Sequence, residues 1–173
     1  GRMMVSFIQS NYRGFGSGIV IPGTGISMND RMENFRFDPA HANCLEGGKR
    51  PYHTIIPGFL SKEGKAVGTI WHSMGGFMQP QAHVQVVENL IDWHLNPQQA
   101  LDSPRWQWIG GKKIDIEADV PPAEVLKLIR RGHEVTVKAD LTAMGRGQMI
   151  LRAPDGTLCG ATEKRSDGQI MSY

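Results

Sequence analysis

Two pairs of strand-like segments joined by tight turns constrain the fold of this chain most strongly. Tyr52–Leu60 and Lys65–Ser73 flank the turn "SKEGK", and the two halves of "GQMILRAPDGTLCGATE" flank a turn at "PDG". A glycine-containing turn between two apolar runs is typical of a β-hairpin, whose strands are antiparallel. The chain is therefore expected to build antiparallel sheet.

A helix is expected directly after two adjacent glycines, Gly75 and Gly76. Pro80 suits its first turn, because the missing proline N–H would be unpaired there in any case. Apolar residues recur at helical spacing in two stripes, which are Val84, Val87 and Ile91, and Val86, Leu90 and Trp93.

Start and stop signals predict two further helices. Asn96 caps a short helix that begins at Pro97, and a longer helix runs from a proline start after Asp119 to a stop at Gly132. Other strands are expected at residues 4–10, 19–21 and 133–139. Hairpins with helices on their faces predict an α+β layered domain, and 173 residues suit a single domain, 1–173. A strand so close to the first residue also needs a neighbour, which suggests a processed chain or a fragment.

Composition excludes several classes of function. The net charge is +2, and no basic run alternates with aromatic residues, so neither nucleic acid nor an anionic membrane is an expected partner. No apolar stretch has the roughly 20 residues of a membrane-spanning helix, and no secretory signal is visible, which favours the cytoplasm. The histidines lack metal-ligand spacing, so no metal or cofactor is expected. Cys44 and Cys159 could form one disulfide, but their spacing has no metal or redox signature, and they are expected to be reduced and buried.

The Gly75–Gly76 junction allows two interpretations. A strand that turns sharply into a helix presents unpaired N–H groups at the positive end of the helix dipole. Such a turn can bind an anion, or the oxyanion of an acyl transfer. The alternative is a turn that needs glycine only for tight packing, and the residues alone favour that alternative.

Other polar residues are weaker candidates for a site. Arg31, Glu33 and Asn34 follow a glycine-rich loop and could hold a small polar substrate, although the ordinary explanation is a solvated turn. His53 and Thr54 form an adjacent polar pair. Trp106 and Trp108 are expected to pack in the core. No Ser-His-Asp order or G-x-S-x-G elbow is visible, so the chain offers an oxyanion donor without a nucleophile.

Several motifs, in the same order, resemble the small subunit of the γ-glutamyltransferase family. They are "FGSGIVIPGTGISMNDRMENF", "GGKRPYHTIIPG", "SMGGFMQPQ", "SPRW" and "GATEKRSDGQIMSY", and the resemblance covers essentially the whole chain. It implies an N-terminal-nucleophile hydrolase with a four-layer αββα sandwich, made by self-cleavage of a precursor. The nucleophile would be a Thr at the new N-terminus, with its own amine as base. That Thr and the first strand would lie upstream of Gly1.

The resemblance also assigns roles to residues of this chain. Gly75 and Gly76 fall on the oxyanion glycine pair of the family, and Asn11 falls on a substrate-contacting Asn. Gln9 stands where the family has a supporting Thr, and Ser10 lies one position away. His53 and Thr54 match two serines that contact the glutamyl carboxylate. Arg31 and Asn34 match a Gln and an Asp that hold the glutamyl α-amino group.

These departures predict an altered substrate. Asn34 lacks the charge with which an Asp grips an ammonium group, and Arg31 would repel that group and attract a carboxylate. The expected substrate is therefore an anionic or neutral amide without a nearby α-amine. The forms "FIQS" and "GKRPYHT" also resemble the divergent branch of the family that includes cephalosporin acylases and oxamate amidohydrolase. The expected partner is the large subunit of the same precursor, and the family allows a dimer of heterodimers. Alternatives are γ-glutamyl transfer or glutathione hydrolysis, and an inactive fragment or interaction module.

Overall fold

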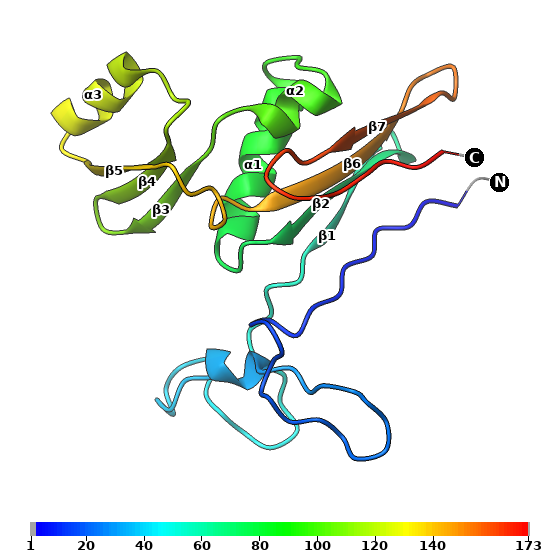
Figure 1. Cartoon of the computed structure of the whole chain (residues 1–173), viewed down its shortest axis with the longest axis vertical. Helices are drawn as coiled ribbons and strands as arrows, with labels where there is room; N and C mark the ends of the chain where they lie inside the picture. Colours follow the sequence, from blue (N-terminus) through cyan, green and yellow to red (C-terminus); the bar gives the residue numbers. More distant parts are fainter. Residues whose placement is uncertain (1–2, 173) are drawn as a thin grey trace. The chain divides into compact units, whose positions relative to one another are not determined.

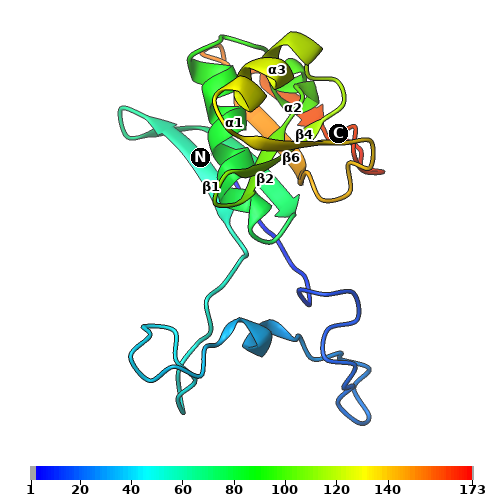
Figure 2. The same cartoon turned by 90° about the vertical axis from the view of Figure 1, so that its left-hand side faces the viewer.

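The computed structural model describes residues 3–172, with only the backbone of residues 70–74. It forms two compact units, of which one comprises the chain up to Phe7 and from Ile56 onward, and the other is Ile8–Ile55. Figures 1 and 2 show the larger unit as a mixed helix and sheet structure, and it contains every strand and α-helix that the described residues form.

A four-stranded antiparallel sheet in the order β1-β2-β6-β7 is the main framework of the larger unit. Its strands are β1 (Pro57–Lys62), β2 (Lys65–Met74), β6 (Arg146–Arg152) and β7 (Leu158–Thr162). Both predicted hairpins are confirmed: β1 pairs with β2, and β6 pairs with β7. Glu63 and Gly64 both have positive φ, 51° and 75°, as the tight turn between β1 and β2 requires.

The first predicted strand of this sheet is shorter than expected. It begins at Pro57 and not at Tyr52. In the segment before Pro57, two backbone N–H groups donate to side chains: Tyr52 N–H donates to Asn43 Oδ1, and Ile55 N–H donates to His53 Nδ1. These N–H groups cannot then join a strand ladder.

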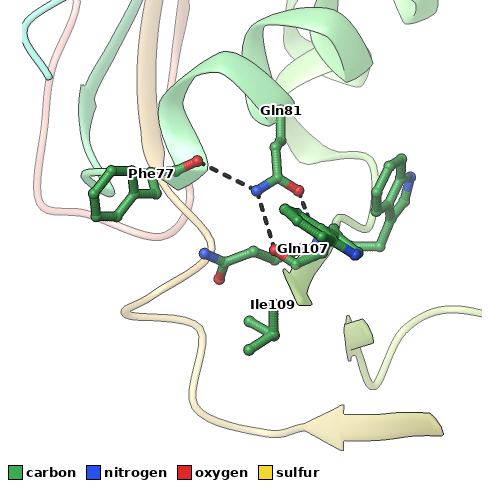
Figure 3. Close-up of a pocket in the computed structure, with 6 residues that line it drawn as sticks. Phe77, Gln81, Gln107 and Ile109 are labelled. Atoms are coloured by element: carbon green, nitrogen blue, oxygen red, sulfur yellow. Dashed lines mark hydrogen bonds between the residues drawn. The ribbon is translucent and has the colours of Figure 1, made fainter. Parts of the chain in front are cut away.

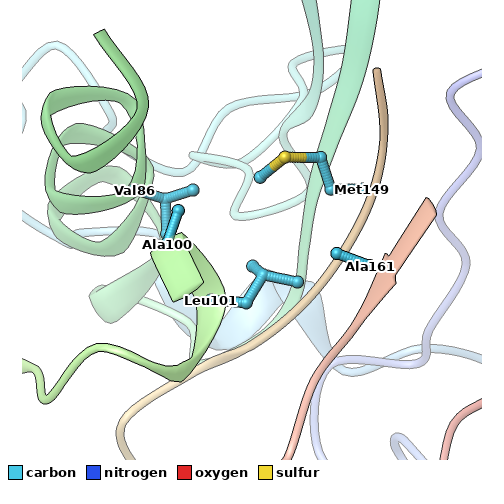
Figure 4. Close-up of a cluster of buried hydrophobic side chains, with 5 residues drawn as sticks. All are labelled: Val86, Ala100, Leu101, Met149 and Ala161. Carbon is cyan, nitrogen blue, oxygen red and sulfur yellow. The ribbon is translucent and has the colours of Figure 1, made fainter. Parts of the chain in front are cut away.

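Two helices cover one face of the sheet, α1 (Met78–Ile91) and α2 (Pro97–Asp102). The predicted cap of α2 is confirmed, because Asn96 and Gln99 form a reciprocal capping box and Pro97 is the first helical residue. Between these helices and the strands lies a core of five fully buried side chains (Figure 4), namely Val86, Ala100, Leu101, Met149 and Ala161.

A second sheet of three strands, β3-β4-β5, completes the larger unit. It contains β3 (Trp106–Gly110), β4 (Lys113–Glu117) and β5 (Glu134–Lys138). Strands β3 and β4 are antiparallel, whereas β4 and β5 are parallel and are joined through α3 (Pro122–Arg130). A parallel pair needs such a crossover. The sequence predicted α3 and β5 but not β3 and β4.

Four buried charged residues tie the two sheets and α2 together. Arg105 contacts Glu163 at 2.7 Å, and Arg165 contacts Glu163 at 2.7 Å and Glu117 at 2.6 Å. Burial lowers the pKa of Arg105 against the opposing charge of Glu163. Burial also acts on Arg165, but its hydrogen bonds with Glu117 and the charge of Glu163 outweigh that effect and raise its pKa. Buried ion pairs of this kind cost desolvation energy, which the hydrogen bonds of both guanidinium groups offset.

Several sequence-based expectations are wrong. Residues 4–10 form no strand in the structure, because no described strand pairs with them, and Val5 and Phe7 are about 60% exposed. The strand expected at residues 19–21 is only a bridge between Val20 and Ser27. Both cysteines are free as expected, but Cys159 is exposed and Cys44 is half-buried.

The described part of the chain lacks two features. None of its helices has the length and apolar character needed to cross a membrane. No cluster of three or more His, Cys, Asp or Glu side chains that could ligate a metal occurs among the described residues.

Candidate functional site

The turn between β2 and α1 has the sharp geometry that the double glycine predicts. Strand β2 ends at Met74, and α1 begins at Met78. Gly75 and Gly76 have φ values of +136° and +49°. The Gly75 carbonyl accepts from Met78 N–H at 2.7 Å, and the Gly76 carbonyl accepts from Gln79 N–H at 3.2 Å. The chain thus passes from strand to helix within three residues.

The two glycines differ in what surrounds them. A Cβ on Gly75 would lie 3.1 Å from Met78 Cβ and 3.3 Å from Gly145 Cα, so packing within the chain requires glycine there. A Cβ on Gly76 would meet no described atom within 4 Å. Only its φ favours glycine, and a φ near +50° is one that Asn also tolerates. Tight packing therefore explains why position 75 is glycine, but it does not explain Gly76. The side of Gly76 on which a Cβ would lie is open, and we refer to it as the open side of Gly76.

The smaller unit holds Arg31 in a polar enclosure. Arg31 lies on the short 3-10 helix η1 (Arg31–Asn34) and is 4% exposed. Its Nη1 donates to Thr54 Oγ1 at 3.1 Å, and its Nη2 donates to Ser10 Oγ at 2.7 Å. The guanidinium carbon lies 5.5 Å from the centre of the Tyr12 ring. Among the described residues, no carboxylate forms an ion pair with Arg31. A buried cation without an anionic partner favours binding of an anion.

Asn34 lies next to the same enclosure through Tyr12. The Tyr12 hydroxyl donates to Asn34 Oδ1 at 3.3 Å, and Tyr12 has a positive φ of 80°. Asn34 Nδ2 is buried and has no acceptor among the described residues. An unsatisfied buried N–H group costs free energy unless a ligand or water accepts from it. Asn34 therefore offers a donor to something that the described chain does not contain.

His53 and Thr54 lie in different surroundings, although they are neighbours. Thr54 is 3% exposed and accepts from Arg31, whereas His53 is exposed. Partial burial and then the positive charges of Arg31 and Arg50 lower the pKa of His53. His53 is thus biased toward its neutral form.

Asn11 stands at the start of the glycine-rich loop. It is half-buried, its carbonyl accepts from Asp30 N–H at 3.2 Å, and its Cβ would lie 3.1 Å from a Cβ on Gly16. The loop therefore folds back on the residues around Asn11. The structure brings Arg31, Thr54 and, through Tyr12, Asn34 together in the smaller unit, while Gly75 and Gly76 belong to the larger unit.

Two contacts of Arg31 were not foreseen from the sequence. The Ser10 hydroxyl fixes one side of the guanidinium group, and the Tyr12 ring covers it. The hydroxyl of Ser10, next to Asn11, was a signal from which the first contact could have been predicted. The second contact depends on the backbone of Tyr12, whose positive φ has no signal in the sequence.

An apolar hollow of about 620 Å³ lies on the larger unit, beside the glycine turn (Figure 3). It is lined by Phe77, which follows Gly76, and by Gln81 and residues 106–109 of β3. Gln81 holds α1 against β3, because its amide donates to Trp108 O and accepts from Trp108 N–H. Trp106 and Trp108 are 44% and 54% exposed, so the expectation that both pack in the core is wrong. Both lie on β3, which was not predicted from the sequence, and both line the hollow.

Comparison with known proteins defines the class to which this mixed helix and sheet chain belongs. The family model of gamma-glutamyltranspeptidase matches residues 1–173. The chain therefore belongs to the gamma-glutamyltranspeptidase family of N-terminal-nucleophile hydrolases, as the sequence motifs predicted.

Individual relatives come from several branches of this family. The chain is 38% identical to the oxamate amidohydrolase proenzyme of Klebsiella pneumoniae over 99% of its own length and 33% of that relative. It is 35% identical to a glutathione hydrolase-like proenzyme of Bacillus subtilis, over 96% of the chain and 33% of the relative. The chain thus spans about a third of the length of these curated relatives.

Solved structures give the same picture. The cephalosporin acylase from Bacillus halodurans matches with a TM-score of 0.91 and 55% identity, over 95% of this chain and 31% of that one. A W525D mutant of the gamma-glutamyltranspeptidase from Pseudomonas nitroreducens matches with a TM-score of 0.85 and 26% identity, over 98% of this chain and 92% of that one. The relatives include proenzymes of an amidohydrolase, of acylases and of glutathione hydrolases.

Proposed function

We propose that this chain is the small-subunit part of an amide hydrolase or acyltransferase whose nucleophile is an N-terminal Thr upstream of Gly1. The observation that carries the proposal is the Gly75–Gly76 turn, with the open side of Gly76 next to a helix N-terminus. The length of the matched chain in the Pseudomonas nitroreducens structure supports a separate small subunit, because our chain covers 92% of it. The proenzyme relatives, three times longer, support a precursor that also supplies a large subunit.

The proposed reaction has two steps. The Thr hydroxyl attacks the amide carbonyl carbon, and the free amine of the same Thr takes the hydroxyl proton. N–H groups of the Gly75–Gly76 turn stabilise the negative oxygen of the tetrahedral intermediate. The C–N bond then breaks, the leaving amine takes the proton, and an acyl ester on Thr remains. Water hydrolyses that ester, or an amine accepts the acyl group in the transferase reaction.

We further propose that Arg31 binds a carboxylate of the acyl group. Arg31 is buried, positively charged and without an ion-pair partner among the described residues, so an anionic substrate would satisfy it. Asn34 would add a neutral donor through Nδ2. Neither group attracts an ammonium ion, which argues against a γ-glutamyl group as the preferred acyl group. Asn11, His53 and Thr54 would complete the substrate contacts.

The proposal also covers the complete architecture. With the upstream segment in place, residues 3–10 would gain a neighbouring strand, and the chain would form one domain of a four-layer αββα sandwich. The TM-score of 0.91 to the Bacillus halodurans cephalosporin acylase supports this arrangement. A dimer of such heterodimers is the proposed assembly.

Steady-state kinetics of the full-length, processed protein test the proposed function. The paired substrates are a γ-glutamyl anilide and the glutaryl anilide, which differ only by the α-amine. The proposal expects the glutaryl compound to have the higher kcat/KM. Glutathione hydrolysis becomes the better assignment if the γ-glutamyl compound is favoured by about tenfold, or 1.4 kcal/mol, or more. An inactive protein with both compounds and with simple anionic amides would support the interaction-module alternative.

A further inference from the structure

Arg105 makes an unusually complete set of hydrogen bonds in the interior of the larger unit. Its side chain is 2% exposed. Nη1 donates to Met144 O at 3.1 Å and to Gly145 O at 2.9 Å, and Nη2 donates to Leu101 O at 3.0 Å and to Glu163 Oε2 at 2.7 Å. Two of these four acceptors belong to the short segment that precedes β6.

That segment lies directly behind the glycine turn. A Cβ on Gly75 would lie 3.3 Å from Gly145 Cα, so the two backbones are in close contact. The ladder between β2 and β6 reaches only to Met74 and Arg146, and its register shifts between His72 and Met74. Gly145 is therefore beyond the last ladder pair, and a side chain holds its carbonyl instead.

Glu163 fixes Arg105 from the opposite side. Its Oε2 accepts from Arg105 Nη2 and also from Gly147 N–H at 3.0 Å, so one carboxylate oxygen holds both the guanidinium group and the start of β6. Its Oε1 accepts from Arg165 at 2.7 Å. The guanidinium group of Arg105 thus fixes the position of Gly145, and the fully buried carboxylate of Glu163 fixes the orientation of that guanidinium group.

We propose that Arg105 is a positioning residue for the oxyanion turn: it holds the Met144–Gly145 backbone, which in turn fixes Gly75 and the direction of the N–H groups at the turn. This inference rests on the proposed function. The alternative is that Arg105 only stabilises the fold and has no effect on the geometry of the turn. A misplacement of about 1 Å in a reacting geometry can cost about 10²-fold in rate, so a small shift of the turn should affect kcat.

Arg165 provides the matched control. It belongs to the same buried cluster, contacts the same Glu163 and has a fully buried side chain. Its other partners are Glu117, Leu101 O and Ser103 O, and no bond from it to residues 144–145 is present among the described contacts. Arg105→Lys and Arg165→Lys should therefore destabilise the fold similarly but affect the turn differently.

The experiment uses the full-length protein with an amide substrate and a boronic acid analogue that forms a tetrahedral anionic adduct. In Arg105→Lys we expect kcat to fall by about tenfold or more, KM to change little, and affinity for the boronate to fall by the same factor as kcat. Arg165→Lys, at a comparable loss of Tm, should keep kcat within about threefold. Equal kcat losses in the two variants, or a wild-type kcat in Arg105→Lys, would overturn the inference.

Amide hydrogen exchange keeps the inference testable when a variant is not processed into active enzyme. Exchange of the peptide that spans Met74–Met78 should be faster in the folded precursor of Arg105→Lys than in wild type, and unchanged in Arg165→Lys. Identical exchange in all three precursors would refute the positioning role. A wild-type enzyme without amidase activity would instead refute the proposed function, whatever the exchange data show.

Discussion

The open side of Gly76 leads to a prediction in which the effects on stability and on catalysis separate. The φ of Gly76 is +49°, and an added Cβ would meet no described atom within 4 Å. Alanine in this left-handed conformation costs about 1–2 kcal/mol, and no steric term adds to it. Gly76→Ala should therefore fold with a modest loss of stability.

The catalytic effect of the same substitution should be larger. The alanine methyl group would occupy the side from which we propose that the carbonyl oxygen approaches the turn. Loss of one oxyanion donor typically costs about 2.7–4 kcal/mol of transition-state stabilisation, and this is the upper limit for Gly76→Ala because its N–H remains. We expect kcat to fall at least tenfold, which corresponds to about 1.4 kcal/mol, with a smaller change in KM.

Gly76→Asn is the matched control for this prediction. Asn tolerates a positive φ better than Ala, so it should be the more stable variant. Its side chain is larger, so it should block the open side at least as well. Chemical denaturation and steady-state kinetics on the full-length protein give both quantities. Two results would contradict a blocked open side. The first is a higher kcat in Gly76→Asn than in Gly76→Ala, so that activity follows stability. The second is a wild-type kcat in both variants.

Further predictions concern the substrate, the pH response, the core and the need for the rest of the precursor. Arg31→Gln combined with Asn34→Asp should shift the ratio of kcat/KM values toward a γ-glutamyl anilide over its glutaryl analogue, and an unchanged ratio would contradict the charge argument. NMR titration should give His53 a pKa below 6.5, lowered by partial burial, Arg31 and Arg50, and Arg31→Gln should raise it. The contribution of His53 to stability is then full above 6.5 and is lost as the pH falls through its lower folded pKa, and a pKa above 6.5 would reverse that sign. Met149→Ala should lower the free energy of unfolding by about 2–5 kcal/mol, because the side chain is fully buried between helices and sheet; denaturation that shows a loss below 1 kcal/mol would contradict this packing. The 173-residue chain alone should hydrolyse no amide, and turnover that survives repurification would refute the need for an upstream nucleophile.

Turns and helix ends could be predicted from the sequence, because a few neighbouring residues determine each of them. The turn at Glu63–Gly64, the cap at Asn96 and the stop at Gly132 are visible in a few residues, and the structure has each of them. The helix of residues 78–91 was also predicted, but neither of its two apolar stripes is right as a whole. Val86 is fully buried and Val87 and Leu90 pack against the core, whereas Val84, Ile91 and Trp93 are 56%, 55% and 72% exposed. The polar Gln79 and Gln85 are buried on this helix instead.

Features that depend on distant partners could not be read from the sequence. Strand β3 was not predicted, and its tryptophans were expected in the core, whereas the structure exposes them and pairs β3 with β4 in an antiparallel ladder. Residues 4–10 have strand-like composition, but a strand exists only when another strand pairs with it. In the candidate site, Arg31 was foreseen, but its enclosure by Ser10 and Tyr12 depends on backbone geometry that no motif reports.

N-terminal sequencing of the fragment that contains these 173 residues, after purification of the full-length protein, tests the central claim most directly. We expect the precursor to be cleaved upstream of Gly1 and the smaller product to begin with Thr. A protein that remains a single uncleaved chain while hydrolysing amides, or a product that begins with a residue other than Thr, would contradict that claim.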